Sequence, residues 1–201
     1  MYWRTSLRKA KGMSLSLPSS KFPDGPLVLD ASVLFNLLGT GIPKELLEAL
    51  DLPCWVEERT AAEVRRMPGQ RAESAPLQPL LDAGCLKLCR MPGQAYETYL
   101  SLLSGPSTDT LDDGESAAIA MAVDGLGSVV LDDKKARRIL AARFPGLTSG
   151  TSLSLMVEAA HRAAWTAQKL CDAVTMARNV SRMAVVLHER ALFAELFPAI
   201  A

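Results

Sequence analysis

Two short runs of apolar residues stand out along the chain because each one ends in a carboxylate. Residues 27–29 lead directly into Asp30, and residues 128–131 lead into Asp132 and Asp133. Short runs with almost no polar interruption are typical of strands that are buried on both faces of a parallel sheet. The sequence therefore predicts two central strands, each followed at once by an acidic side chain.

Segments with helical spacing of apolar residues alternate with these strands. Helices are expected at residues 31–38, 44–50, 60–66, 96–103, 112–124 and 134–143. Weaker strand patterns cover residues 54–56 and 85–88, whereas residues 67–80 and 148–151 are expected to form loops. From residue 153 nearly to the end, the pattern predicts a helical tail. Strands that alternate with helices imply an α/β fold, with a parallel sheet and helices on its faces.

The composition is that of an ordinary globular protein. Of the 201 residues 49% are hydrophobic, and 22 basic side chains balance 22 acidic ones. Zero net charge argues against a protein that coats nucleic acid by bulk electrostatics, although a local basic patch remains compatible with it. Two histidines argue against histidine-based zinc chemistry, and the four cysteines form no CxxC pair. The cysteine pattern favours free thiols in a reducing compartment.

The N-terminal segment, residues 1–25, is a basic lead-in that contains Arg4, Arg8, Lys9 and Lys11. No apolar run of the length of a secretory signal follows it. No apolar stretch of the chain approaches the roughly 20 residues that a membrane-spanning helix needs. We therefore expect a soluble, cytoplasmic protein that does not associate with membranes.

Four acidic positions lie where α/β proteins collect ligands. Asp30 and Asp132 follow strands whose carboxyl ends meet at one edge of a parallel sheet, although each could simply cap the next helix. Glu115 lies in the first turn of a helix, where it complements the helix dipole, and Gly114 before it permits close approach of another group. Glu63, taken alone, is a surface glutamate of a helix.

Together these residues resemble the PIN-domain family, the metal-dependent ribonuclease fold of VapC-type toxins. The resemblance covers roughly residues 26–160 and rests on residues 28–32, Glu63, residues 111–122, residues 130–138 and residues 150–153. It implies a PIN-like three-layer sandwich with a central parallel sheet flanked by helices, plus a helical C-terminal tail. The corresponding division is a lead-in at 1–25, a nuclease domain at 26–160 and a helical extension at 161–201.

The resemblance also implies a catalytic set, which consists of Asp30, Glu63, Glu115, Asp132 and Asp133. All of these except Glu63 are implied ligands of Mg²⁺ or Mn²⁺, and which of Asp132 and Asp133 faces the metal stays open. Hard divalent cations prefer carboxylate oxygens, and two such ions about 4 Å apart can activate water and stabilise a leaving oxygen. Ser32 is expected either to orient Asp30 by a hydrogen bond or to contribute to the helix start.

Basic side chains follow the last aspartates directly. Lys134, Arg137 and Arg138 are the expected contacts to RNA phosphates, and Arg137 matches the arginine position of the family. The simple alternative is a solvated helix face. The apolar tail makes a homodimer plausible, and two histidines in it, His161 and His188, are expected to be surface or packing residues.

The expected function is that of an Mg²⁺- or Mn²⁺-dependent endoribonuclease, the toxin of a type II toxin–antitoxin pair, with a cognate antitoxin as its partner. One alternative is a catalytically degenerate PIN-like module that binds RNA or protein. Another is an Asp-based phosphatase or phospho-acceptor receiver, although Asp30-Ala31-Ser32 lacks the Asp-x-Asp of haloacid dehalogenases. Arg182 and His188 have the Arg-x5-His spacing of HEPN ribonucleases, but that fold is all helical.

Overall fold

The computed structural model describes residues 22–65 and 75–198. These residues form a five-stranded sheet in the order β3-β2-β1-β4-β5, in which every neighbouring pair is parallel. The strands are β1 (Leu27–Leu29), β2 (Cys54–Glu57), β3 (Lys87–Cys89), β4 (Ser128–Val130) and β5 (Ser149–Gly150). The two strands predicted from the apolar runs, β1 and β4, are neighbours in the sheet. The predicted lead-in lies outside the described residues apart from residues 22–25.

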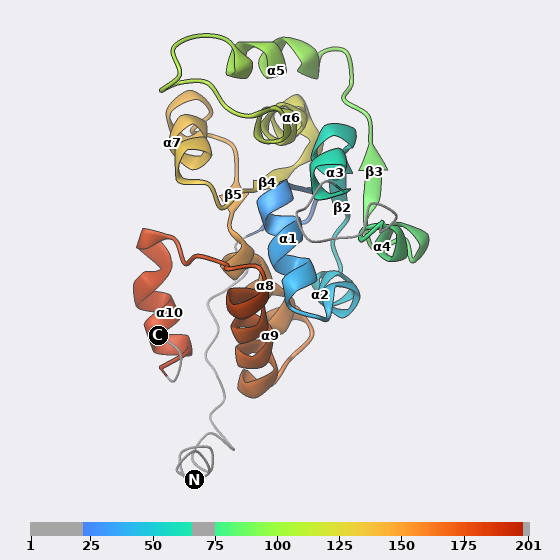
Figure 1. The fold of residues 1–201 in the computed structure, drawn as a ribbon, viewed down its shortest axis with the longest axis vertical. Helices are drawn as coiled ribbons and strands as arrows, with labels where there is room; N and C mark the ends of the chain where they lie inside the picture. The colour runs from blue at the N-terminus through green and yellow to red at the C-terminus, as the bar shows by residue number, and fades with distance from the viewer. Residues whose placement is uncertain (1–21, 66–74, 199–201) are drawn as a thin grey trace.

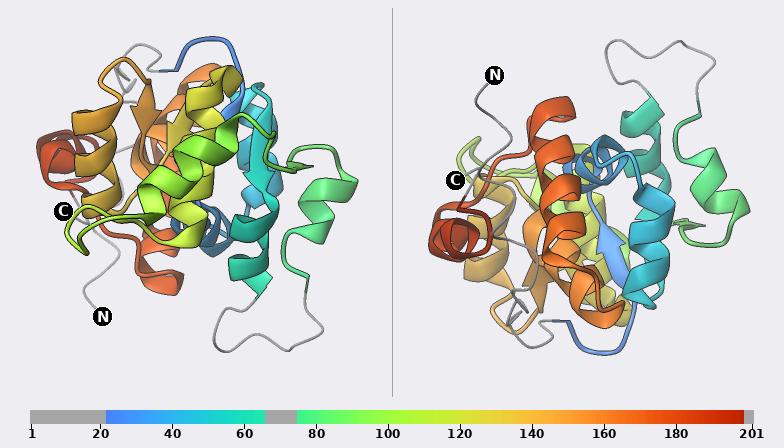
Figure 2. Two further views of the ribbon diagram at one scale, coloured as in Figure 1. Left: turned by 90° about the horizontal axis from the view of Figure 1, so that it is seen from above. Right: turned by 90° about the horizontal axis from the view of Figure 1, so that it is seen from below.

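Helices cover both faces of the sheet, so the prediction of a three-layer α/β sandwich is confirmed (Figure 1, Figure 2). One side carries α6 (Asp113–Met121) and α7 (Lys134–Arg143), with α5 (Ala95–Leu103) packed on α6. The other side carries α1 (Ala31–Gly39), α2 (Pro43–Leu50), α8 (Ser152–Arg162) and α9 (Ala167–Val180). The remaining α-helices are α3 (Glu58–Arg65), α4 (Gln78–Asp82) and α10 (Arg190–Leu196).

Alternate residues of the central strands belong to different apolar cores. Leu27 and Leu29 lie in the core that α1, α2, α8 and α9 help to form, whereas Val28 lies in the core on the side of α6 and α7. All three side chains are completely buried. Because both faces of the sheet are covered, a polar residue within the strand would lose its contact with water on either face.

Three helices begin with side-chain caps beyond the strand ends. Asp30 caps α1 by accepting a hydrogen bond from the Ser32 N–H at 3.1 Å, and Asp133 caps α7 by accepting one from the Ala136 N–H at 2.8 Å. Thr151 caps α8. The strands are parallel, so these helix starts gather at one edge of the sheet and set the position of the functional side chains.

The structure corrects the predicted loops and tail at three places. α4 occupies residues 78–82, where a loop is expected through residue 80, because Leu80 packs into the core and its helix tolerates Pro79 in the first turn. β5 lies within the expected loop at 148–151, because its two residues have no apolar pattern and are recognisable only by their pairing with β4. The tail is interrupted by the left-handed residues Ala164 (φ 49°) and Arg182 (φ 58°).

Smaller differences concern helix boundaries. α3 begins two residues before the predicted start at residue 60, and its predicted end at residue 66 lies outside the described residues. The helix predicted at 112–124 is α6, continued by a π-helical turn, η1 (Ala122–Leu126). Within the described part of the chain, no helix has the length and apolarity to cross a bilayer.

Candidate active site

Asp30 lies at the centre of the carboxyl edge of the sheet. Its backbone N–H donates to the Val130 carbonyl at 3.2 Å, which joins the ends of β1 and β4. Only 3% of the residue is exposed, and its carboxylate accepts the Ser32 hydroxyl at 2.6 Å. The hydrogen bond expected from Ser32 is therefore present, and it fixes the orientation of a nearly buried carboxylate.

Asp132, at the end of β4, is held by donors from two helices. The Asn36 amide of α1 donates to Oδ2 at 2.7 Å, and the Ser152 backbone N–H of α8 donates to Oδ1 at 2.8 Å. The Ser152 hydroxyl donates to Oδ2 as well and accepts from the Asn36 amide at 3.1 Å. Both donor residues are buried. Asp132 thus keeps a defined position although its neighbours are also acidic.

The next residue, Asp133, is exposed and has a different local role. One of its carboxylate oxygens accepts from the Ala136 N–H at 2.8 Å and caps α7. Asp132 caps no helix and is instead bonded to donors from α1 and α8. Asp133 is therefore a helix cap, whereas the carboxylate of Asp132 is held in place by donors from two other helices.

Glu63 is drawn to α6 by a backbone donor. The Gly114 N–H donates to Glu63 Oε1 at 3.0 Å, and the Thr60 hydroxyl donates to the Gly114 carbonyl at 3.3 Å. A Cβ atom on Gly114 would lie 2.5 Å from Glu63 Oε1, so a glycine is what allows this approach. Glu63 is consequently half-buried next to the first turn of α6 rather than on an outer helix surface.

Burial, together with neighbouring negative charges, raises the pKa of three carboxyl groups of the site. Burial raises the pKa of Glu115 from 4.5 to about 7, and the charges of Asp30 and Asp133 add to the effect. Burial also raises the pKa of Asp30, with a contribution from Asp132, and that of Glu63, with a contribution from Asp30. Because the Asp30 charge acts on both glutamates, these groups share one electrostatic environment.

The basic residues after Asp133 differ in their contacts. Arg137 Nη2 lies 3.2 and 3.3 Å from the two ring nitrogens of His188. Arg138 donates to the Thr108 carbonyl and forms an ion pair with Asp109 at 3.5 Å. Lys134 is exposed at the first position of α7. Arg137 is half-buried, whereas Arg138 is exposed and contacts the loop before α6.

A family model described as a PIN domain matches residues 26–187. The chain belongs to the PIN-domain family. The fold is thus of the nuclease type, and nucleases of this family act on nucleic acids and usually use divalent metals. Comparisons with curated proteins and with solved structures gave no match. The parallel sheet of this PIN domain contradicts the all-helical HEPN alternative, and the Arg-x5-His spacing brings His188 to Arg137 instead.

The side chains of the candidate site offer the oxygen ligands that a hard divalent cation prefers. Asp30, Glu63, Glu115 and Asp132 offer only oxygen atoms, and a cation would relieve the repulsion between these carboxylates. Among residues 22–65 and 75–198, no three His, Cys, Asp or Glu side chains are already close enough to hold an ion. Glu63 and Asp132 are bonded to protein donors instead.

Several residues that shape the site of this PIN domain were missed by the sequence interpretation. Asn36 and Ser152 hold Asp132, and Glu189 accepts from Thr151 at the start of α8. Asn36 carried a weak signal, since it is the polar residue within the otherwise apolar stretch 33–38. Ser152 lies within residues 150–153, on which the family resemblance partly rests, but its role as a donor to Asp132 depends on the tertiary fold, as does the role of Glu189.

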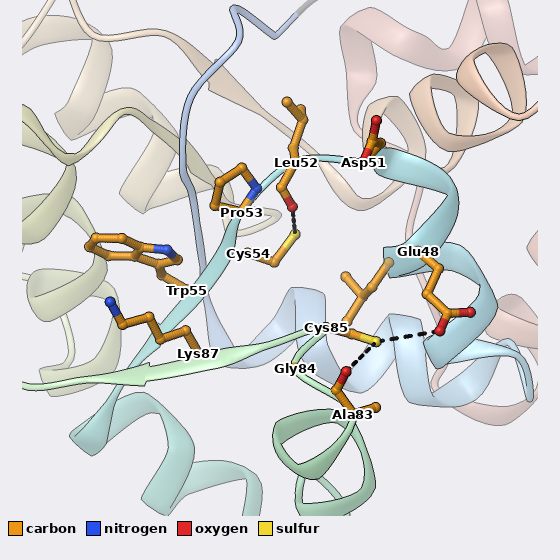
Figure 3. A pocket seen from close by; sticks show the side chains of 11 residues that line it. Glu48, Asp51, Leu52, Pro53, Cys54, Trp55, Ala83, Gly84, Cys85 and Lys87 are labelled. Atoms are coloured by element: carbon orange, nitrogen blue, oxygen red, sulfur yellow. Dashed lines mark hydrogen bonds between the residues drawn. The ribbon is translucent and has the colours of Figure 1, made fainter.

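A hollow of about 620 Å³ lies at the opposite edge of the sheet, between the starts of β2 and β3 (Figure 3). Cys54 and Cys85 line it, and Lys87 lies over the Trp55 ring, with Nζ 4.5 Å from the ring centroid. Burial raises the pKa of Cys54 to about 12, so that thiol stays protonated. All four cysteines are free, as predicted. The hollow contains none of the carboxylates of the candidate site.

Proposed function

We propose that the protein is a divalent-metal-dependent endoribonuclease and that its active site is the carboxylate group around Asp30. The observation that carries the proposal is electrostatic. Burial raises the pKa of Asp30, Glu63 and Glu115, and the charge of Asp30 adds to the rise at both glutamates. Clustering uncompensated acids is costly for a folded protein, and a bound cation offsets that cost.

The geometry supports distinct roles for the acidic residues. Asp30, Asp132 and Glu115 would hold Mg²⁺ or Mn²⁺, with Asp30 and Asp132 coming from neighbouring strand ends. Asp133 supports the site as the cap of α7, and Glu63 contributes negative charge from α3, next to the first turn of α6. A bound cation of this kind supplies a Lewis acid and lowers the pKa of a coordinated water.

The first turn of α7 would hold the phosphates of the substrate. Lys134 and Arg137 follow the acidic edge within one helical turn, and arginine can bind a phosphate through two parallel hydrogen bonds. Arg138 was expected to contribute as well, and its contacts to Thr108 and Asp109 would have to open for it to reach RNA. RNA would therefore lie with its backbone between the carboxylates and α7.

An RNA cleavage assay with Mn²⁺ tests the proposal directly. We expect cleavage by the wild type, inhibition by EDTA, and loss of at least a hundredfold in rate for Asp30→Asn and Glu115→Gln. Asparagine caps a helix as well as aspartate does, so Asp30→Asn should fold normally. The matched control is Glu97→Gln, since Glu97 is likewise the third residue of its helix and is exposed. Cleavage that persists in EDTA or in Asp30→Asn would refute the mechanism.

RNA binding without cleavage in any divalent metal would favour the alternative of a degenerate binding module. The toxin role and the antitoxin partner are proposals that need their own test. Co-expression with the product of an adjacent small gene should relieve growth inhibition and yield a co-purifying complex. Light scattering of the purified chain tests the predicted homodimer.

A further inference from the structure

The chain returns to the candidate site after α9. It leaves α9 at Val180, crosses to a short 3-10 turn, η2 (Leu187–Glu189), and continues into α10 (Figure 1). α10 lies on the side of the molecule that carries α7 and β5, far from α4 (Figure 2). The turn therefore lies next to the starts of α7 and α8. The family match ends at residue 187, so His188 and Glu189 lie beyond it.

Glu189 is a buried carboxylate with a specific donor. Only 5% of the residue is exposed, and its two oxygens lie 2.7 and 2.8 Å from the Thr151 hydroxyl, which donates to them. Removing a carboxylate from water is costly unless hydrogen bonds replace the lost hydration. A buried glutamate at this position therefore holds the turn firmly against the start of α8.

Thr151 connects Glu189 to the site. Its hydroxyl accepts from the Ser154 N–H at 3.1 Å, and its backbone N–H donates to the Ser154 hydroxyl at 2.7 Å, which closes a capping box. The following residue, Ser152, donates twice to Asp132. A single peptide unit thus separates the residue that Glu189 binds from the residue that holds Asp132.

The same turn also contacts α7, the helix that carries Lys134, Arg137 and Arg138. His188 lies against Arg137, so the turn joins the start of α8, which holds Asp132, to α7, which begins beside Asp133. The turn is placed to keep the starts of α7 and α8 in a fixed position relative to each other.

We propose that Glu189 is a positioning residue of the active site, which acts through Thr151 and Ser152 to hold Asp132 in its binding position. The inference rests on the proposed function for the cation that Asp132 would bind. A carboxylate ligand must keep its position closely, and loss of an outer hydrogen-bond partner typically lowers metal affinity by 10–100-fold. The C-terminal segment is then part of the site rather than an appendage.

Three variants of the full chain separate this role from general packing. Glu189→Leu removes the acceptor at nearly constant volume, and Glu189→Gln keeps an oxygen that the Thr151 hydroxyl can reach. Thr166→Val is the matched control, because Thr166 caps α9 as Thr151 caps α8 and is remote from Asp132 in the hydrogen-bond network. If Glu189→Leu does not fold, Glu189→Ala removes the same acceptor and leaves the Thr151 cap of α8 in place.

The first measurement is amide hydrogen exchange of the metal-free protein. We expect Glu189→Leu to accelerate exchange in the peptide that contains Ser152 and Ser154, whereas Glu189→Gln leaves it near the wild-type rate. Thr166→Val should change exchange only at the start of α9. Unchanged exchange at Ser152 in Glu189→Leu would overturn the inference.

The second measurement is Mn²⁺ affinity, read from the free Mn²⁺ signal in electron paramagnetic resonance without RNA. Glu189→Leu should bind Mn²⁺ about tenfold more weakly than the wild type, and Glu189→Gln within about threefold of it. Faster exchange with unchanged affinity would make Glu189 merely structural and would also overturn the inference. Failure of the proposed function has a different signature, since the wild type itself would then bind no Mn²⁺.

Discussion

The charge of Glu115 makes the stability of the metal-free protein depend on pH in a defined direction. Burial and the charges of Asp30 and Asp133 raise the pKa of Glu115 from 4.5 to about 7. The folded state therefore binds the proton more tightly than the unfolded state does, and folding is favoured at low pH. This contribution is fully present below pH 4.5 and is lost as pH rises through about 7.

Glu115→Gln removes the titrating group and keeps the shape of the side chain. A pKa that moves from 4.5 to about 7 corresponds to about 3 kcal/mol at full ionisation. Glu115 keeps some contact with solvent, which reduces the effect. We expect Glu115→Gln to exceed the wild type in unfolding free energy by about 1–3 kcal/mol at pH 8, with a difference near zero at pH 4.5.

Urea unfolding in EDTA between pH 4.5 and 8.5, analysed by linear extrapolation, measures this difference. Glu97→Gln is the control, because Glu97 also occupies the third position of a helix and shares the helix-dipole interaction of Glu115. The control should differ from the wild type by no more than a few tenths of a kcal/mol over this pH range. The reasoning is refuted if Glu115→Gln differs from the wild type by the same amount at pH 5 and pH 8, or if Glu97→Gln behaves identically.

Three further outcomes follow from individual contacts. Gly114→Ala should leave the unfolding temperature unchanged or slightly higher, because alanine favours helices. The added Cβ should displace the Glu63 carboxylate and slow RNA cleavage at least tenfold, and unchanged cleavage would contradict this. Arg137→Ala should weaken RNA binding and lower the slope of log affinity against log salt by about 1, whereas Arg143→Ala, at the far end of the same helix, should not. Ser116→Ala should raise the unfolding free energy by about 1 kcal/mol in urea titrations, since the Ser116 hydroxyl is buried without a partner among the described residues; a loss of stability would show that a partner exists.

The fold was readable from sequence wherever local pattern and burial agree. β1 and β4 are apolar on both faces because helices cover both faces, and an uninterrupted apolar run records that condition directly. β5 was not readable, because Ser149–Gly150 owes its strand conformation to the edge of β4 rather than to its own side chains. The breaks in the C-terminal helices at Ala164 and Arg182 likewise carry no glycine or proline signal.

The residues of the candidate site could likewise be identified from local sequence, whereas their individual roles could not. Residue type and position after a strand were sufficient to single out Asp30, Asp132 and Asp133, but the roles of the last two were indistinguishable in the sequence. The tertiary fold separates them, since Asp133 reaches the N–H groups of its own helix and Asp132 reaches donors on α1 and α8. Such donors lie up to 96 residues away along the chain, so local spacing cannot reveal them.

By itself, the sequence determined the central parallel strands, the carboxylates that follow them and the family to which the chain belongs, because these depend on hydrophobic periodicity and on residue type. Only the tertiary structure decided how the charges interact. It placed Glu63 against the Gly114 N–H, gave Glu115 a pKa of about 7, and brought Glu189 beneath the start of α8. These effects arise from burial and from distances between segments that are remote in the chain, and neither quantity is recorded in a local pattern of residues.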